Sequence, residues 1–153
     1  MLPYQRVRNL SPESAAYIGG LIDGEGTITL SRLHANERRR LVVSIANTEI
    51  ELLTFVLSEV GAGKITRKRT TSDRHTPSYC YGISSQQTLA LLAQVTPWLK
   101  SYKRRRAELA IAKYQLLTPR NGKYTSEAHE RRLAFESTFL AILPRTVERS
   151  SRP

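Results

Sequence analysis

The sequence predicts an α+β fold with the element order α-β-β-α-β-β, followed by C-terminal helices. Helix signals occur over 12–23 and 48–61, where small or apolar residues recur every three or four positions. Polar and apolar residues instead alternate in four short segments, which is the period of a half-buried strand. Two such segments follow each helix, so we expect a four-stranded antiparallel sheet with one polar face.

The composition is that of one strongly basic domain. A chain of 153 residues with 40% hydrophobic content can bury a core. We expect one domain over 1–153, with a basic arm at 1–10 and a disordered basic tail at 144–153. The net charge of +11 and the sequence pI of about 10.3 predict a polyanionic partner, of which nucleic acid is the commonest.

Several function classes are not indicated. No apolar run of about 18 residues occurs, so we expect no membrane partner, and the first ten residues lack the apolar core of a secretory signal. These features favour an intracellular protein, but they do not distinguish between the host cytoplasm or nucleoid and an organelle. The single cysteine, Cys80, excludes an internal disulfide and a cysteine-based zinc site, and the histidines are scattered without metal-ligand spacing.

The first helix is expected from Pro12 to about Asp23. Ser11 can cap it, Pro12 suits the first helical position, and Glu13 matches the positive end of the helix dipole. Small residues four positions apart form a strip without bulky side chains, and these are Ala15 and Gly19, and Ala16, Gly20 and Gly24.

The first hairpin is expected after this helix. From Thr27 the period is two, with Ile28 and Leu30 inward, and the stretch RRLVVSIAN, 39–47, continues that pattern with Leu41, Val43 and Ile45 inward.

The second block repeats this order. A helix is expected over 48–61, capped by Thr48, with Ile50 in its core stripe and ended by Gly61. Strands are expected at 64–70 and 79–84. The remainder predicts helices at about 85–95, 98–117 and 126–143, with a break at Pro97.

The acids that follow the glycine strip indicate a metal-dependent chemistry. Glycine and alanine at a spacing of four allow two helices to approach closely. Two carboxylates brought together at such a crossing repel each other unless a hard cation such as Mg²⁺ lies beside them. This arrangement suits metal-assisted phosphodiester hydrolysis.

Residues 18–26, IGGLIDGEG, resemble the LAGLIDADG motif of homing endonucleases. Ile18 stands for the first leucine and Gly20 for the first glycine, while Leu21, Ile22, Asp23 and Gly26 match outright. The element order over 12–143 also resembles that family. Because the chain contains one such motif, it resembles the single-motif homodimeric branch of that family. The resemblance implies a four-stranded DNA-binding sheet that forms a saddle, and a homodimer formed through the motif helix.

The resemblance also implies site residues. Glu25 would be the metal-binding acid, joined by the backbone carbonyl of Gly24, and the metal would be Mg²⁺, with Mn²⁺ as a substitute. Asn47, at the end of the second strand, would orient a water molecule. Lys103 would be the catalytic lysine, with Lys100 as the second choice. The interface residues would be Ala16, Gly19, Gly20 and Asp23.

Each of these assignments has a simpler alternative. Glu25 replaces the aspartate of the name motif and could be a solvated acid at a helix end. Asn47 could cap the next helix. Lys103 belongs to a KRRR run that could be a solvated face. No arginine follows Asn47, where some relatives have a supporting cation.

The outward side chains of the sheet are the candidate DNA contacts, because hydroxyls and cations can bind base edges and phosphates. Tyr79 and Tyr81 share one face of the last strand, and the pattern leaves open whether they point toward DNA or toward the core. The candidate contacts are Thr29, Ser31, Arg32, Arg38, Arg40, Ser44, Lys64, Thr66, Arg67, Lys68, Arg69, Thr70 and Tyr81.

The expected function is that of an intron-encoded homing endonuclease. It would cut both strands of a long pseudo-palindromic double-stranded DNA with a divalent metal and leave short 3′ overhangs. One alternative is a non-catalytic binder of the same fold, either an intron RNA maturase or a DNA-binding regulator. Another is a basic RNA-associated protein with an accidental motif.

Overall fold

A computed structural model of the chain describes residues 5–68, 76–119 and 123–145. The candidate contacts Arg69 and Thr70, and most of the expected tail 144–153, lie outside the described residues. The predicted α+β order is confirmed. The elements are α1 (Pro12–Glu25), β1 (Gly26–Ser31), β2 (Arg40–Asn47), α2 (Ile50–Val60), β3 (Lys64–Lys68), β4 (Ser78–Ser84), α3 (Ser85–Val95), η1 (Thr96–Trp98), α4 (Tyr102–Lys113) and α5 (Ser126–Leu140).

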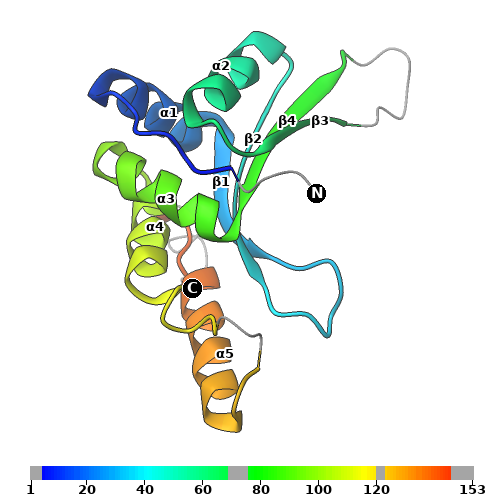
Figure 1. The fold of residues 1–153 in the computed structure, drawn as a ribbon, viewed down its shortest axis with the longest axis vertical. Helices are drawn as coiled ribbons and strands as arrows, with labels where there is room; N and C mark the ends of the chain where they lie inside the picture. Colours follow the sequence, from blue (N-terminus) through cyan, green and yellow to red (C-terminus); the bar gives the residue numbers. More distant parts are fainter. Residues whose placement is uncertain (1–4, 69–75, 120–122, 146–153) are drawn as a thin grey trace.

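The four strands form one antiparallel sheet in the order β1-β2-β4-β3. Figure 1 shows the helices on one side of this sheet, while the β3–β4 end and the β1–β2 loop extend away from them. The other face of the sheet carries no helix of the described chain. The register places Ile28, Val43 and Ile83 in one row across the sheet on the helix side.

The core lies between the sheet and the helices. The predicted inward residues Leu41, Val43 and Ile45 are at most 1% exposed, and they pack with Ile18 and Ile22 of α1. Burying one such side chain stabilises the fold by roughly 1.5–3 kcal/mol. The inward faces of β1 and β2 are therefore as the alternation predicts.

The motif helix is two residues longer than expected and passes directly into β1. The Ser11 hydroxyl caps it by accepting from the Ser14 amide at 3.1 Å. A Cβ on Gly26 would lie 2.9 Å from the Ile22 Cα and 3.0 Å from the Ser44 carbonyl oxygen. Only glycine permits this close approach of the α1–β1 junction to β2.

Helix α2 begins later than predicted, so the assignment of Thr48 as its cap is wrong. Glu49 occupies the cap position without a side-chain bond, and the Asn47 carboxamide oxygen accepts from the Glu49 amide at 2.8 Å. This turn of an Asn onto the backbone two residues ahead competes with helix formation. Ile50, the first residue of α2, lies 38% exposed rather than in the core. Gly61 ends α2 as predicted, with φ +73°.

The helix expected over 98–117 is also shorter. Pro97 lies in the 3₁₀ turn η1, and α4 starts only after Ser101, whose hydroxyl accepts from the Lys103 amide at 3.2 Å. The start of α4 is therefore fixed by a local cap as well as by its contacts with the end of α1.

The N-terminal segment is held against the body over its described part, residues 5–10. The Arg8 amide donates to the Val60 carbonyl at 2.8 Å, and the Leu10 amide donates to the Gln94 side chain at 2.7 Å. No helix among the described residues is long and apolar enough to cross a membrane.

Candidate active site and nucleic-acid interface

The Asp23 carboxylate joins the end of α1 to the start of α4. One oxygen accepts from the Lys100 amide at 2.7 Å, and the other accepts from the Ser101 amide at 3.2 Å and hydroxyl at 2.6 Å. The carboxylate thus supplies the acceptor and negative charge that a helix N-terminus lacks. Partial burial opposes ionisation, but the Ser101 hydroxyl, the two amides and the Lys103 charge hold the pKa of Asp23 below its usual value.

Lys103 completes this joint from α4. It is 8% exposed, and its Nζ donates to the Ile22 carbonyl at 2.9 Å and to the Asp23 carbonyl at 2.8 Å. These carbonyls lie in the last turn of α1, where a cation also matches the negative end of the dipole. Burial lowers the pKa of the Lys103 ammonium, and the charges of Asp23 and Glu25 oppose that shift. Lys103 therefore lies beside both motif acids and is not on a solvated face.

Glu25 has a different environment from Asp23. It is the last residue of α1 and is exposed, and its carboxylate makes no hydrogen bond or ion pair within the described part of the chain. The last turn of α1 contains no basic residue. A carboxylate at the negative end of a helix dipole is unfavourable unless a cation approaches it, and the ammonium of Lys103 is already bonded to backbone carbonyls. The surroundings of Glu25 thus favour an external cation.

Asn47 lies at the same end of the sheet as Glu25. Gly26 pairs with Ile45, so the α1–β1 junction and Asn47 are within two positions of each other in the β1–β2 register. The Asn47 oxygen is bonded to the Glu49 amide. Asn47 is therefore observed to form a turn. The nitrogen of its side-chain amide could still bind a water molecule, so the water-orienting role stays a prediction.

The strip of small residues on α1 divides into two faces. Gly20 and Gly24 are exposed, and no atom lies within 4 Å of a Cβ placed on either. Gly19 instead is buried, and its Cβ position lies 3.1 Å from the Trp98 Cβ. Its assignment to a dimer interface is therefore wrong, because the same chain already occupies that face. Asp23 is likewise engaged within the chain, whereas Ala16, half-buried, remains available with Gly20.

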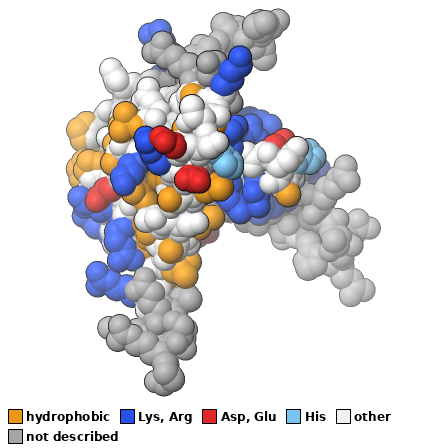
Figure 2. Space-filling view, turned by 90° about the horizontal axis from the view of Figure 1, so that it is seen from below, with side chains coloured by type: hydrophobic (Ala, Val, Ile, Leu, Met, Phe, Trp, Pro, Cys, Tyr) orange, Lys and Arg blue, Asp and Glu red, His pale blue; other side chains and the backbone are white. Residues whose placement is uncertain are grey.

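The open face of the sheet carries most of the candidate DNA contacts. The register places the predicted outward side chains of β1, β2 and β3 on this face, and Thr27 shares a hydrogen bond of 2.7 Å with Ser44 there. Figure 2 shows that Lys and Arg side chains are spread over the molecule seen from below, with few acids among them. The candidates on this face are Thr29, Ser31, Arg40, Ser44, Lys64, Thr66 and Lys68.

The other described candidates are placed differently. Tyr81 is fully buried and donates to the Ala62 carbonyl at 2.6 Å, so its assignment as a DNA contact is wrong. Arg67 pairs with Tyr79 in the register and lies on the helix side of β3, an edge strand. The Arg38 guanidinium lies 3.3 Å from the centre of the Tyr124 ring. Arg32 donates within its own loop, to the Ala35 carbonyl at 3.1 Å.

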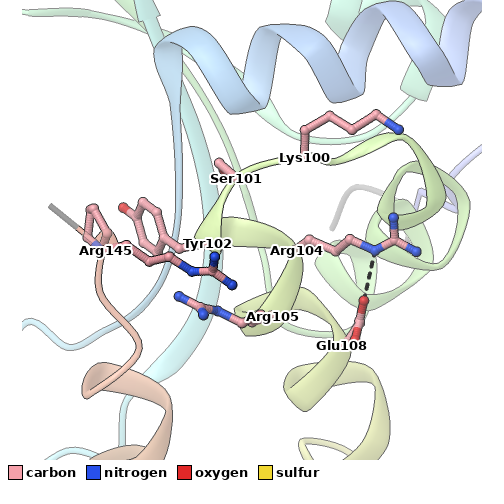
Figure 3. A pocket seen from close by; sticks show the side chains of 8 residues that line it. Lys100, Ser101, Tyr102, Arg104, Arg105, Glu108 and Arg145 are labelled. Carbon is pink, nitrogen blue, oxygen red and sulfur yellow. Dashed lines mark hydrogen bonds and ion pairs between the residues drawn. The ribbon is translucent and has the colours of Figure 1, made fainter. Parts of the chain in front are cut away.

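A basic cavity that the sequence did not predict is lined in part by Lys100 and Ser101, the bonding partners of Asp23. It has a volume of about 530 Å³ and lies between the start of α4 and the segment after α5. Figure 3 shows Lys100, Arg104, Arg105 and Arg145 lining it, with Arg104 paired to Glu108 at 2.8 Å. The KRRR run was a signal for part of this cluster, but Arg145 lies far along the chain from that run and could not be placed from the sequence.

The donor set fits a divalent cation only in part. Carboxylate and carbonyl oxygens such as those of Glu25 and Gly24 are ligands that Mg²⁺ accepts. However, no group of three or more His, Cys, Asp or Glu side chains that could hold a metal occurs within the described ranges. A metal site at Glu25 would therefore need ligands beyond those that the described residues bring together there.

Solved structures share this fold, whereas no family model and no curated protein matches the sequence. The homing endonuclease I-CvuI, in complex with its target in the presence of calcium, has a TM-score of 0.70 and 14% identity, over 86% of this chain and 83% of that chain. The archaeal intron-encoded homing endonuclease I-Vdi141I, complexed with DNA, has a TM-score of 0.58 and 16% identity, over 86% and 84%. The LAGLIDADG meganuclease I-AabMI, bound to uncleaved DNA, has a TM-score of 0.62 and 20% identity, over 81% of this chain but only 44% of that chain. At these identities the likeness is one of fold.

Proposed function

We propose that this chain, which has the LAGLIDADG homing endonuclease fold, is a site-specific DNA endonuclease that uses a divalent metal. It would act as a homodimer, hydrolyse both strands of a long pseudo-palindromic duplex and leave short 3′ overhangs. An intron is its proposed source. The observation that carries this proposal is Glu25, an exposed carboxylate without a hydrogen-bond partner in the described chain, between the open basic sheet and a buried lysine.

The residues of this chain would act around a bound cation. Glu25 and the Gly24 carbonyl would hold Mg²⁺, which supplies charge stabilisation of the phosphate and acidifies a water molecule. Lys103 stabilises the α1 end and adds a positive charge beside Glu25. Asp23 fixes α4 and therefore Lys103 in place. Asn47 would orient water from the neighbouring strand end.

A second copy of the chain would complete the site. The open face of α1 at Gly20 and Gly24 allows a close helix contact, and it is bordered by the exposed aromatic pair Tyr17 and Phe55, whose ring centres are 5.3 Å apart. A two-fold contact there would bring Glu25 from each copy to one place. Two-fold protein symmetry favours a target with related half-sites.

The open sheet would lie in the major groove. Its hydroxyls and cations can bind base edges and phosphates, and the basic cavity at Lys100 and Arg145 offers a further phosphate site. Affinity should fall steeply with salt, because each neutralised phosphate releases counterions. Mg²⁺ or Mn²⁺ would support cutting.

Cleavage of a plasmid that carries the uninterrupted host locus tests this function. With Mg²⁺ we expect double-strand cutting by the wild type, and a loss of at least about 100-fold for Glu25→Gln, because a metal ligand contributes several kcal/mol at the transition state. The variant should still bind the duplex. A metal chelator should likewise abolish cutting and leave binding intact.

Glu13→Gln is the matched control, since Glu13 is an exposed acid at the other end of α1. It should cut as the wild type does. Cutting by Glu25→Gln at the wild-type rate would overturn the assignment of the site. Tight binding to intron RNA without any DNA cleavage would favour the maturase alternative instead.

A further inference from the structure

The β1–β2 loop, residues 32–39, is an ordered structure with its own internal bonds. One oxygen of the Glu37 carboxylate accepts from the amides of Leu33 and His34, at 3.3 and 3.4 Å. The Glu37 amide donates back to the His34 carbonyl at 3.0 Å. The loop therefore closes on itself and can be positioned as a unit.

Contacts from the C-terminal part of the chain hold the base of this loop. The Arg38 guanidinium lies 3.3 Å from the centre of the Tyr124 ring, a cation–π contact. The Arg39 side chain pairs with Glu136 of α5 at 3.5 Å. The Arg39 carbonyl accepts from the Arg132 guanidinium at 2.6 Å. Two consecutive loop residues are thus bound by three residues near or within α5.

The supporting residues are themselves fixed in the protein interior. Arg132 is 2% exposed and Glu136 is 6% exposed, and they pair at 3.3 Å. Arg132 also donates to the Leu117 carbonyl and the Thr118 hydroxyl, and the Tyr124 hydroxyl donates to the same Leu117 carbonyl at 3.0 Å. A buried ion pair is weak evidence for stability, because an apolar pair of the same shape can stabilise as well. The network instead fixes the position of the loop, because its bonds to Arg38 and Arg39 determine where these two loop residues lie.

The loop lies at the end of the hairpin away from Glu25. Strand β1 starts beside Glu25 and has six residues, so at about 3.3 Å per residue the loop begins about 20 Å from that end. This distance corresponds to about six base pairs at about 3.4 Å each. On the proposed function, the loop would therefore reach the outer base pairs of each half-site.

We propose that Tyr124, Arg132 and Glu136 are positioning residues that hold the β1–β2 loop in place for the outer base pairs of the DNA target. In this proposal Arg38 and Arg39 are bound to the support, and they carry the loop rather than read bases. The inference rests on the proposed function, because it assigns a specificity role within the same DNA interface.

Two measurements with the full-length protein test this role. The first selects bound duplexes from a randomised library, and the second measures how much each single base-pair change lowers the affinity for the selected duplex. Tyr124→Leu removes the ring under Arg38. At positions about six or more base pairs from the cut, we expect about fivefold less discrimination between the preferred base pair and the others, because the free energy of one cation–π contact corresponds to a factor of about that size. Discrimination near the centre should not change. Tyr124→Phe keeps the ring and should restore the outer discrimination. Glu136→Gln keeps the shape of the side chain but removes its charge, and it should lose the outer discrimination as Tyr124→Leu does.

Glu127→Ala is the control, because Glu127 is an exposed residue of α5 that pairs only with Arg131 in the described chain. It should leave the profile unchanged. Hydrogen exchange should also be faster at the Leu33, His34 and Glu37 amides in Tyr124→Leu than in the wild type. A selective wild type with an unchanged Tyr124→Leu profile would overturn this inference alone. A wild type that binds every duplex equally would overturn the proposed function and this inference with it.

Discussion

Two acids of the motif, Asp23 and Glu25, lie in different surroundings although they are two residues apart. The Asp23 carboxylate accepts three hydrogen bonds from Lys100 and Ser101, which is why the pKa of Asp23 lies below its usual value. Glu25 is exposed at the end of the same helix. Asp23 therefore stabilises the junction of α1 and α4, whereas Glu25 is the acid to which the proposed function assigns the cation.

The two candidate lysines can be separated by experiment. Lys103→Met removes the ammonium that donates to the Asp23 carbonyl and to the Ile22 carbonyl, which keeps its bond from the Gly26 amide. We expect the change to lower the free energy of unfolding by about 1–3 kcal/mol. Lys100→Met removes an exposed side chain and should change it by less than about 0.5 kcal/mol. Urea denaturation of both variants measures this.

Cleavage rates of the same two variants then assign the catalytic lysine. If Lys103 acts in the reaction, Lys103→Met should lose cutting under conditions in which it is fully folded. Equal stability of the two variants would contradict a structural role for the Lys103 ammonium at the end of α1.

At the level of elements, α1 and α4 support each other at their ends. Asp23 of α1 satisfies the amide end of α4, and Lys103 of α4 satisfies the carbonyl end of α1. Each helix dipole thus meets a charge of the opposite sign. The α1–β1 junction, which carries Glu25, is held by this joint on one side and by β2 on the other.

Gly26→Ala tests how tightly that junction is packed. Its Cβ would meet the Ile22 Cα at 2.9 Å and the Ser44 oxygen at 3.0 Å, both backbone atoms that cannot rotate away. We expect a loss of about 1–3 kcal/mol in the free energy of unfolding, measured by urea denaturation. Gly82→Ala, where nothing lies within 4 Å, is the control and should be nearly neutral. A Gly26→Ala variant as stable as the wild type would show that the junction is loosely packed.

At the scale of the whole molecule, the proposed function requires a second chain to complete the metal site at Glu25, so assembly would decide whether that site forms. Gly20→Leu should leave the monomer folded, because nothing lies within 4 Å of the new Cβ and glycine costs a helix about 1 kcal/mol. The side chain would instead separate two helices that meet at this face. We expect the dimer to weaken by about 5- to 150-fold, the equivalent of about 1–3 kcal/mol.

Sedimentation of the variant and the wild type over a range of concentrations measures this. Ala112→Leu, at an exposed position of α4, should sediment as the wild type does. A wild type that stays monomeric with its DNA bound would contradict the two-chain site.

The sequence alone determined the element order, the inward faces of β1 and β2 and the place of the motif acids at a helix end. These features follow from local rules, because backbone geometry makes alternate strand residues and every third or fourth helix residue share a face. The resemblance of IGGLIDGEG to a known motif then indicated the fold, which the solved structures bear out.

Tertiary structure alone decided which side chains meet. The partners of Asp23 and Lys103 are 77 to 81 positions apart in the chain, and the burial of Gly19 by Trp98 and of Tyr81 near Ala62 also depends on packing between elements. Periodicity assigns a residue to a face, but it does not say whether another segment of the chain covers that face. The support of the β1–β2 loop by α5 has the same cause, because Arg39 and Arg132 are brought together only by the folded core.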